Sequence, residues 1–374
     1  MKVMTFVLVW ILAFLPSLVF TGWLAHARAQ HRQNWSDDEL LGPQKFHEHP
    51  VPRVGGIGVA LGLWLAAAFL WWLNREALGA PALSLLLCGL PVLGAGLAED
   101  VTKRVSPVAR LLFTALSAAL GIAVLGVFIP RTDLPGLDWA VSFTPVAMLL
   151  TVFAVVGVAN SINLIDGFNG LASACVAIML LGLALVAWRV GDALVISLAV
   201  AGMGAVLGFL IWNFPRGLVF LGDGGAYFLG FFLAQVALLL LFRNPQVSPL
   251  FPLLLVIYPV FETVFSMYRR KVLKGRPVGQ PDAAHLHSLI YRRFLRSNFG
   301  EQGRAQRIRR NSMTSPFLWL LTLFSVIPAV VFWNNSMALM LCGLIFAVIY
   351  VTLYWRIVRF RVLRWRLASK VHTH

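Results

Sequence analysis

Three polar side chains recur at every third position in an otherwise apolar part of the chain. Asn160, Asn163 and Asp166 are separated by apolar or small residues, so on a helical turn they point roughly the same way. Gly167 and Gly170 follow, and they let the backbone turn or approach another group closely. Such a turn either caps two helices through its Asn and Asp side chains or forms a site for a cation or a sugar nucleotide.

Two adjacent carboxylates, Glu99 and Asp100, precede Lys103 at the end of another apolar run. A carboxylate pair can hold a divalent cation, and a lysine supplies a point charge for a phosphate. Taken alone, the same three residues also fit a helix end with solvated charges.

A further aspartate, Asp223, lies among glycines directly before an apolar run, in the stretch 220–227. An aspartate at this place can ligate Mg²⁺ while nearby backbone N–H groups face a phosphate. It can equally serve as a helix N-cap. Phe220, which opens the stretch, is by itself more typical of a core or interface aromatic than of a residue that stacks on a base.

A basic loop carries two histidines and an arginine at fixed spacing. His285, His287 and Arg292 follow Asp282 and could grip a diphosphate. A zinc site needs more His or Cys ligands than this loop offers, and a solvated basic loop is the alternative. Arg53, after a Pro-Val-Pro stretch and before a Gly-Gly pair, is a further candidate for substrate binding.

The composition excludes a soluble domain. Of the 374 residues, 59% are hydrophobic and 12% are charged, whereas charged residues usually make up about a quarter of a soluble protein. The net charge of +16 therefore fits basic loops on the cytoplasmic side of a membrane protein, and we expect no nucleic-acid partner. The three cysteines lie in apolar runs and indicate neither a disulfide framework nor a metal site.

About eleven apolar runs approach the roughly 20 residues that a membrane helix needs. They predict an all-α, polytopic membrane protein with runs at 3–25, 54–73, 81–98, 107–129, 142–159, 170–188, 193–212, 225–242, 249–268, 316–334 and 336–355. We expect residues 1–355 to form one integral membrane domain, with a cytoplasmic loop at 269–315. Residues 356–374 form a basic cytoplasmic tail, which we expect to lie on anionic lipid.

The distribution of basic residues predicts an extracytoplasmic N-terminus and a cytoplasmic C-terminus. With this orientation most Lys and Arg side chains fall on the inner side, including the stretch 269–310 and the tail. This assignment does not depend on the acidic residues, yet it leaves only Glu76, Asp133, Asp138 and Asp192 in the outer loops. Five acids from separate motifs fall on the inner face: Glu99, Asp100, Asp166, Asp223 and Asp282. Helix capping alone is a poor explanation for carboxylates from four loops at one membrane surface.

Together these stretches resemble the polyprenyl-phosphate N-acetylhexosamine-1-phosphate transferase family. The resemblance runs from about His47 to Arg293, in motif order. The family includes undecaprenyl-phosphate N-acetylglucosamine-1-phosphate transferases and the phospho-MurNAc-pentapeptide translocase. The spacing from His285 through His287 to Arg292 resembles the branch that uses simple UDP-amino sugars.

The resemblance implies a role for each matching residue. The implied catalytic residues are Glu99, Asp100, Asp166 and Asp223. The residues expected to bind substrate are Lys103, Asn160, Asn163, Phe220, His285, His287, Arg292 and Arg53, with Phe220 stacking on uracil. Asp223 and Asp166 are expected to hold Mg²⁺, with Mn²⁺ as an alternative. The sequence departs from the family pattern at Glu99, where Asp is usual, and at Asn169, where a second Asp often stands.

The expected activity is transfer of a sugar-1-phosphate from a UDP-N-acetylhexosamine to undecaprenyl phosphate, which releases UMP. UDP-GlcNAc or a 6-deoxy amino sugar would be the donor, and the product would start an envelope polysaccharide such as O-antigen. The expected place is the bacterial inner membrane, among membrane lipids and with the active site in the cytoplasm; a homodimer is left open.

Two other classes of protein share some of these features. A secondary transporter is the alternative, because membrane carboxylates often mark ion pathways, although transporter sites tend to lie near the bilayer midplane. A structural assembly protein explains neither the basic histidine loop nor the Gly-Asp elements.

Overall fold

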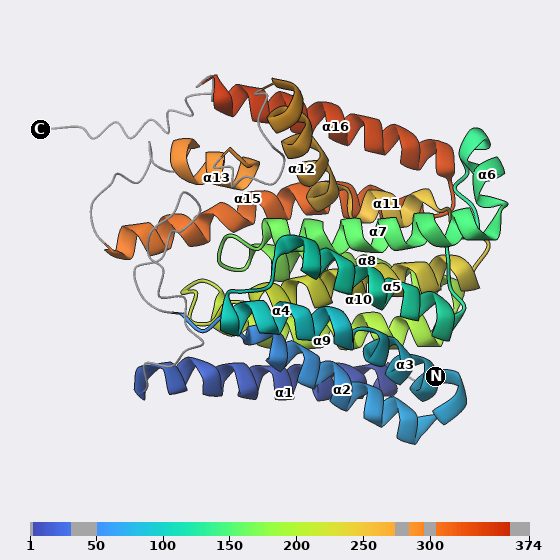
Figure 1. The fold of residues 1–374 in the computed structure, drawn as a ribbon, viewed down its shortest axis with the longest axis horizontal. Helices are drawn as coiled ribbons and strands as arrows, with labels where there is room; N and C mark the ends of the chain where they lie inside the picture. Colours follow the sequence, from blue (N-terminus) through green and yellow to red (C-terminus); the bar gives the residue numbers. More distant parts are fainter. Residues whose placement is uncertain (1–2, 31–50, 274–283, 295–303, 360–374) are drawn as a thin grey trace, which may run out of the picture.

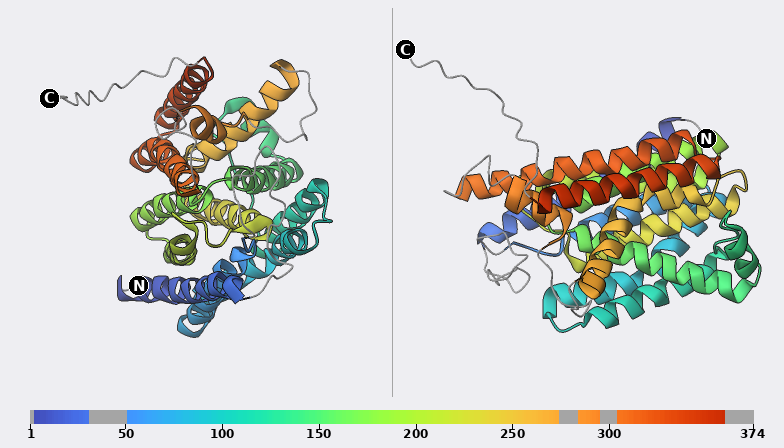
Figure 2. Two further views of the ribbon diagram at one scale, coloured as in Figure 1. Left: turned by 90° about the vertical axis from the view of Figure 1, so that its left-hand side faces the viewer. Right: turned by 90° about the horizontal axis from the view of Figure 1, so that it is seen from above.

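A computed structural model of the chain describes residues 3–30, 51–273, 284–294 and 304–359 (Figure 1). Within these residues the structure is a bundle of helices that run roughly side by side along one long axis. The left view of Figure 2 looks along the helices, and α1 and α16 lie on opposite sides of the bundle. The predicted all-α fold is thereby confirmed for the described part of the chain.

The longer helices are α1 (Val3–Gln30), α2 (Gly55–Leu73), α4 (Leu90–Thr102), α5 (Pro107–Leu125), α7 (Thr144–Ile165), α8 (Leu171–Val190), α9 (Ala193–Asn213), α10 (Gly222–Arg243), α12 (Ile257–Tyr268), α15 (Arg304–Val331) and α16 (Ser336–Val358). The shorter ones are α3 (Ala80–Cys88), α6 (Pro135–Val141), α11 (Leu250–Leu255) and α13 (Leu286–Leu289). Three π-helical turns span Arg75–Gly79, Arg269–Leu273 and Ile290–Phe294.

Nine of the described helices are long and apolar enough to cross a membrane, and a bent pair, Arg75–Cys88 with Leu90–Thr102, brings the number to ten. The chain is a multi-pass membrane protein. The remaining predicted span, 249–268, is instead divided into α11 and α12 at Val256. Pro259 explains the break, because it has no N–H to donate and its ring clashes with the carbonyl of Leu255 four residues earlier. Figure 1 shows α12 crossing the bundle axis at a steep angle.

Helix α10 occupies the centre of the bundle, and almost every residue from Gly222 to Leu241 is buried. Two other helices approach the start of α10 so closely that only glycine fits. A Cβ added to Gly96 would lie 2.4 Å from the Cα of Gly224, and one added to Gly56 would lie 2.3 Å from the Cα of Gly225. The backbones of α4 and α2 therefore fix where α10 begins.

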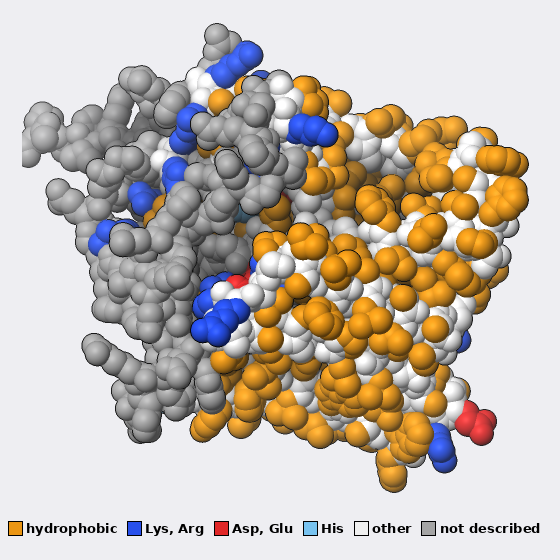
Figure 3. Space-filling model, viewed as in Figure 1, with side chains coloured by type: hydrophobic (Ala, Val, Ile, Leu, Met, Phe, Trp, Pro, Cys, Tyr) orange, Lys and Arg blue, Asp and Glu red, His pale blue; other side chains and the backbone are white. Residues whose placement is uncertain are grey.

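The surface divides along the same axis. Figure 3 shows apolar side chains over most of one face, and Lys and Arg side chains gathered at the end where α4 ends and α15 begins. Below, this end is named the site end. Helix α1 begins at the opposite end and α16 finishes at the site end (Figure 1), as the predicted opposite placement of the termini requires. The assignment of the site end to the cytoplasm stays a prediction.

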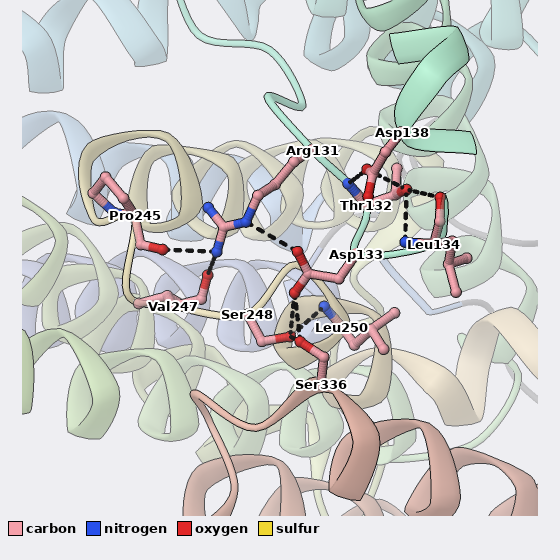
Figure 4. A network of polar contacts seen from close by, with 10 residues as sticks. All are labelled: Arg131, Thr132, Asp133, Leu134, Asp138, Pro245, Val247, Ser248, Leu250 and Ser336. Carbon is pink, nitrogen blue, oxygen red and sulfur yellow. Dashed lines mark hydrogen bonds and ion pairs between the residues drawn. The ribbon is translucent and has the colours of Figure 1, made fainter. Parts of the chain in front are cut away.

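A polar network ties three connections together at the opposite end (Figure 4). The Arg131 guanidinium donates to the carbonyls of Pro245 and Val247 at 2.7 and 2.8 Å, and its Nε lies 3.0 Å from Asp133 Oδ1. The other Asp133 oxygen accepts hydrogen bonds from the hydroxyls of Ser248 and Ser336. Beside them, Thr132 donates its backbone N–H and its hydroxyl to Asp138 Oδ1. These residues, Arg131, Thr132, Asp133, Asp138, Ser248 and Ser336, are named the opposite-end network.

Candidate active site

A carboxylate from α4 holds the start of α10. Asp100 is buried, with 1% of its surface exposed. Its Oδ1 accepts a hydrogen bond from the Asp223 N–H, and its Oδ2 accepts one from the Gly224 N–H, each at 2.9 Å. The first N–H groups of a helix have no partner within that helix. Asp100 supplies two of them with acceptors and so fixes Asp223 in place.

The Asp223 side chain connects two further helices. Asn163 of α7 donates from Nδ2 to Asp223 Oδ1 at 2.8 Å. The Arg110 guanidinium of α5 forms an ion pair with Asp223 Oδ2. Arg110 and Asn163 therefore meet at the Asp223 carboxylate, while Asp100 binds the backbone at the same residue. These residues, Asp100, Arg110, Asn163 and Asp223, together with Asp166 are named the α10 cluster.

A second contact lies one helical turn further along α10. The Tyr227 hydroxyl donates to Asn160 Oδ1 at 3.2 Å, and the Arg110 guanidinium carbon lies 5.7 Å from the centre of the Tyr227 ring. Asn160 and Asn163 thus point the same way, as their spacing predicted, and the structure shows that they face α10.

Asp166 differs from the other acids of the α10 cluster, because within the described residues its side chain accepts no hydrogen bond. Removal from water raises the pKa of the Asp166 carboxyl to about 7; the Arg53 charge opposes this shift, while the Asp223 and Asp100 charges add to it. A cation placed near Asp166 would relieve the repulsion among the three acids.

The segment before α2 pairs with the segment before α10. Phe220 donates its N–H to the carbonyl of Pro52 at 2.8 Å, and the Gly55 N–H donates to the carbonyl of Phe220 at 3.0 Å. Gly222 has a positive φ of 78°, and a Cβ there would lie 1.8 Å from the carbonyl oxygen of Arg53. This pairing brings Arg53 and Phe220 to the start of α10, and their role in substrate binding stays a prediction.

The histidine loop, residues 284–294, lies against the turn that follows α7. The rings of His285 and His287 stack with centroids 5.2 Å apart, and the His287 ring meets Phe168 edge-on at 5.4 Å. His287 Nε2 lies 3.8 Å from a Cβ built on Gly167. Burial lowers the pKa of His287 to about 3, with the His285 charge adding to the effect and Glu262 opposing it. His287 is therefore neutral at pH 7 and can donate a hydrogen bond without carrying a charge.

The remaining predicted residues occupy turns. Glu99 Oε2 accepts from the Val105 N–H at 2.7 Å, and Lys103 ends α4 in the left-handed conformation. Arg292 lies half-buried in the π-helical turn of the histidine loop. Asn169 donates from Nδ2 to the carbonyl of Pro215 at 2.9 Å, so the structure uses it to tie two loops. Asp282, the stretch before Val51, residues 295–303 and the tail from 360 onward lie outside the described residues.

The acids do not form a preformed metal cage. In the part of the chain that the structure describes, no three His, Cys, Asp or Glu side chains gather closely enough to hold a metal ion. Mg²⁺, however, is usually held by one or two carboxylates together with water and substrate phosphates. Asp166 and Asp223 fit that second arrangement, because within the described residues the Asp166 side chain accepts no hydrogen bond, and the charges of Asp223 and Asp100 act on it together with that of Arg53.

Sequence reasoning missed three residues of this region: Arg110, Tyr227 and Glu262. Arg110 is one of many basic residues on the expected inner side, and its sequence neighbours do not indicate that it pairs with Asp223. Glu262 is the only carboxylate in the apolar run 249–268, and its two oxygens bind the histidine loop and α16. Its presence in a membrane run was a signal in itself, because buried charges there are rare and need partners.

Comparison with known proteins defines the class of this membrane protein. The family model of glycosyl transferase family 4 matches residues 82–241, a range that holds α4, α7 and most of α10 with the whole α10 cluster. The chain belongs to glycosyl transferase family 4.

Its relatives include polyprenyl-phosphate transferases. The chain is 30% identical over 248 residues to a probable undecaprenyl-phosphate N-acetylglucosaminyl 1-phosphate transferase of Bacillus subtilis (strain 168); this match covers 65% of this chain and 66% of the relative. It is 31% identical over 276 residues to the decaprenyl-phosphate N-acetylglucosaminephosphotransferase of Mycobacterium leprae (64% and 66%). It is 27% identical over 265 residues to the undecaprenyl-phosphate alpha-N-acetylglucosaminyl 1-phosphate transferase of Salmonella typhi (67% and 67%). The matched part thus spans about two thirds of these relatives' length.

Proposed function

We propose that this protein transfers a sugar-1-phosphate from a UDP-N-acetylhexosamine to undecaprenyl phosphate at the cytoplasmic face of the bacterial inner membrane. An oxygen of the lipid phosphate attacks the phosphorus that carries the sugar. The bond from that phosphorus to the bridging oxygen breaks, and UMP leaves. UDP-GlcNAc is the first donor to test, followed by 6-deoxy amino sugars, and the product would start an envelope glycan such as O-antigen.

The observation that carries the proposal is the meeting of three separate motifs at the start of α10. Asp100, Asn163 and Asp223 come from different helices and share direct hydrogen bonds. Family membership adds the chemistry, because the relatives are named as transferases that act on polyprenyl phosphates. A transporter is less well supported, since the α10 cluster lies at helix ends and the family is one of transferases.

Phosphoryl transfer depends mainly on positioning and on neutralising charge. The second pKa of a phosphate monoester is about 6, so the lipid phosphate is mostly ionised at neutral pH and needs little help from a base. Asp100, one of the catalytic residues that the resemblance implies, is the candidate acid for accepting a proton from the lipid phosphate. Because both Asp100 oxygens bind backbone N–H groups of α10, the proposal assigns it to holding Asp223 instead.

In the proposal Asp223 and Asp166 hold Mg²⁺, which when bound offsets the charge of the diphosphate and of the leaving UMP. Asn163 orients the Asp223 carboxylate, and Arg110 is a cation that can turn from Asp223 toward a phosphate. Phe220 and Arg53 lie beside the start of α10, where the nucleotide would bind. The histidine loop covers the donor from the side of Gly167.

The test is an assay with purified protein, undecaprenyl phosphate and a UDP-sugar labelled in the sugar. Label in the lipid fraction together with released UMP, dependent on Mg²⁺ or Mn²⁺, is the expected result. Uptake of a solute into vesicles without turnover would favour the transporter. A panel of donors in the same assay identifies the sugar.

A further inference from the structure

Glu262 is a buried carboxylate in α12 that does not belong to the α10 cluster. It is 1% exposed, and burying a charge is costly unless the charge is paired and hydrogen-bonded. Its Oε1 lies 3.2 Å from His285 Nδ1 and accepts the Leu286 N–H at 2.9 Å. Its Oε2 accepts the Tyr350 hydroxyl of α16 at 2.7 Å. Three donors from two separate parts of the chain therefore converge on Glu262.

A second pair of side chains holds the residue just before these donors. The Arg269 guanidinium donates to the carbonyl of Ala284 and to the hydroxyl of Tyr354. Tyr354 itself lies 3.2 Å from the Ala284 carbonyl oxygen, to which it can donate. Glu262 and Arg269 are two helical turns apart, and Tyr350 and Tyr354 are one turn apart on α16, so each pair shares a helix face. The start of the histidine loop is thus held at two backbone groups: the carbonyl of Ala284, bound by Arg269 and Tyr354, and the N–H of Leu286, bound by Glu262.

The contact with Glu262 also determines the state of His285. An ionised carboxylate can only accept a hydrogen bond, so the proton lies on His285 Nδ1 and leaves Nε2 for another partner. His287 is stacked on His285 and reaches Gly167 through its own Nε2. A shift of His285 would therefore move His287 relative to the turn that carries Asp166.

We propose that Glu262 is a positioning residue that places His285 and His287 for the nucleotide-sugar donor. The inference rests on the proposed function, because it assigns the histidine loop to the donor. Glu262 does not touch the donor; it acts through its hydrogen bonds to residues 285 and 286, with Tyr350 keeping its second oxygen engaged.

Kinetic titration of Glu262→Ala and Glu262→Gln tests this role. We expect Glu262→Ala to raise the KM for the UDP-sugar about tenfold or more, the size of a lost charged hydrogen bond, and to leave the KM for undecaprenyl phosphate within about twofold. Glu262→Gln keeps one acceptor oxygen for the loop and an NH₂ group that can donate to Tyr350. It should restore the donor KM to within about threefold of wild type, because the hydrogen-bond geometry survives.

The matched control is Thr263→Val on the same helix. Thr263 is also buried and hydrogen-bonded, but to Ser161 and Pro259 instead of the histidine loop. A general weakening of α12 would raise the donor KM in both variants, whereas positioning by Glu262 spares the control. If Glu262→Ala does not accumulate in the membrane, Glu262→Asp keeps the charge but falls one methylene short of the loop. It should show the same donor-specific loss.

Hydrogen–deuterium exchange over residues 284–293 provides a readout that does not need turnover. Loss of the Glu262 acceptor should speed exchange at Leu286 about tenfold or more, with no change in Thr263→Val. If exchange and the donor KM are both unchanged in Glu262→Ala, the positioning role is wrong. The proposed function would still stand in that case, provided that the wild-type protein turns over normally. A wild-type protein that makes no lipid-linked product, yet shows the expected exchange, would instead count against the proposed function and against a role in donor binding.

Discussion

The acids at the two ends of this bundle are held in opposite ways. In the opposite-end network the donors of Thr132, its backbone N–H first, lower the pKa of Asp138. In the α10 cluster, burial and neighbouring acids raise the pKa of Asp166. One end saturates its carboxylates with protein donors, and the other leaves a carboxylate without one. The comparison suggests which acids are structural and which are kept for a ligand.

The largest expected effect comes from removing the Asp223 charge. Asp223→Asn keeps the shape of the side chain but loses the ion pair with Arg110 and a charge for the proposed Mg²⁺. We expect turnover to fall on the order of a thousandfold, which corresponds to several kcal/mol of transition-state stabilisation. Steady-state assays at saturating Mg²⁺ measure it, and more than about a tenth of wild-type turnover would show that Asp223 is only structural.

The next effect is expected at the histidine loop. His287→Ala removes a donor beside Gly167 and should weaken UDP-sugar use about ten- to a hundredfold, seen in KM or in kcat/KM. The KM for undecaprenyl phosphate should stay nearly constant, because the lipid tail binds among membrane helices. The measurement is a titration of the UDP-sugar and a titration of undecaprenyl phosphate with this variant. A shift in the KM for undecaprenyl phosphate alone would show that the histidine loop does not bind the donor.

A smaller effect, on stability, is expected from Asp166→Asn. Because the folded protein binds the Asp166 proton more tightly than the unfolded chain does, stability from this group is present at low pH and lost as pH rises through about 7. Without divalent cations, Asp166→Asn should therefore be more stable than wild type at pH 8, on the order of 1 kcal/mol after solvent screening. The difference should shrink as pH falls from about 7 and vanish below the unfolded-state pKa, at about pH 4.

Added Mg²⁺ sharpens the same measurement. A ligand that binds only the folded state stabilises it by mass action, so Mg²⁺ with UDP-sugar should raise the melting temperature of wild type more than that of Asp166→Asn. Equal stabilisation of both proteins would remove Asp166 from the proposed metal site.

The smallest effect on activity is expected at the opposite-end network. Asp133→Asn breaks the ion pair with Arg131. The free energy of unfolding should fall by about 0.5–2 kcal/mol, the size expected for a partly buried network, and the melting temperature should fall with it. Turnover of the protein that remains folded should stay within about twofold of wild type. A large loss of kcat with an unchanged melting temperature would contradict the division between the two ends.

Sequence reasoning worked where local spacing determined the outcome. The three-residue spacing of Asn160 and Asn163 placed both on the α7 face that meets α10. Apolar runs located ten of the spans, because length and hydropathy are local properties. Sequence reasoning failed where the partner of a side chain lies far away in the chain. Nothing near Arg110 marks it as the partner of Asp223, 113 residues later, and nothing near Glu262 predicts that it binds a loop and α16.

The glycine contacts at the start of α10 limit which substitutions this protein can accept. Alanine at Gly56 or Gly96 would drive its Cβ into the Cα of Gly225 or Gly224, and backbone atoms, unlike side chains, cannot be trimmed by a second substitution. Compensating changes therefore have no local route. A Cβ at Gly94, on the same helix as Gly96, meets no heavy atom within 4 Å. A random library selected for sugar transfer should accept many residues at position 94 and keep glycine at position 96.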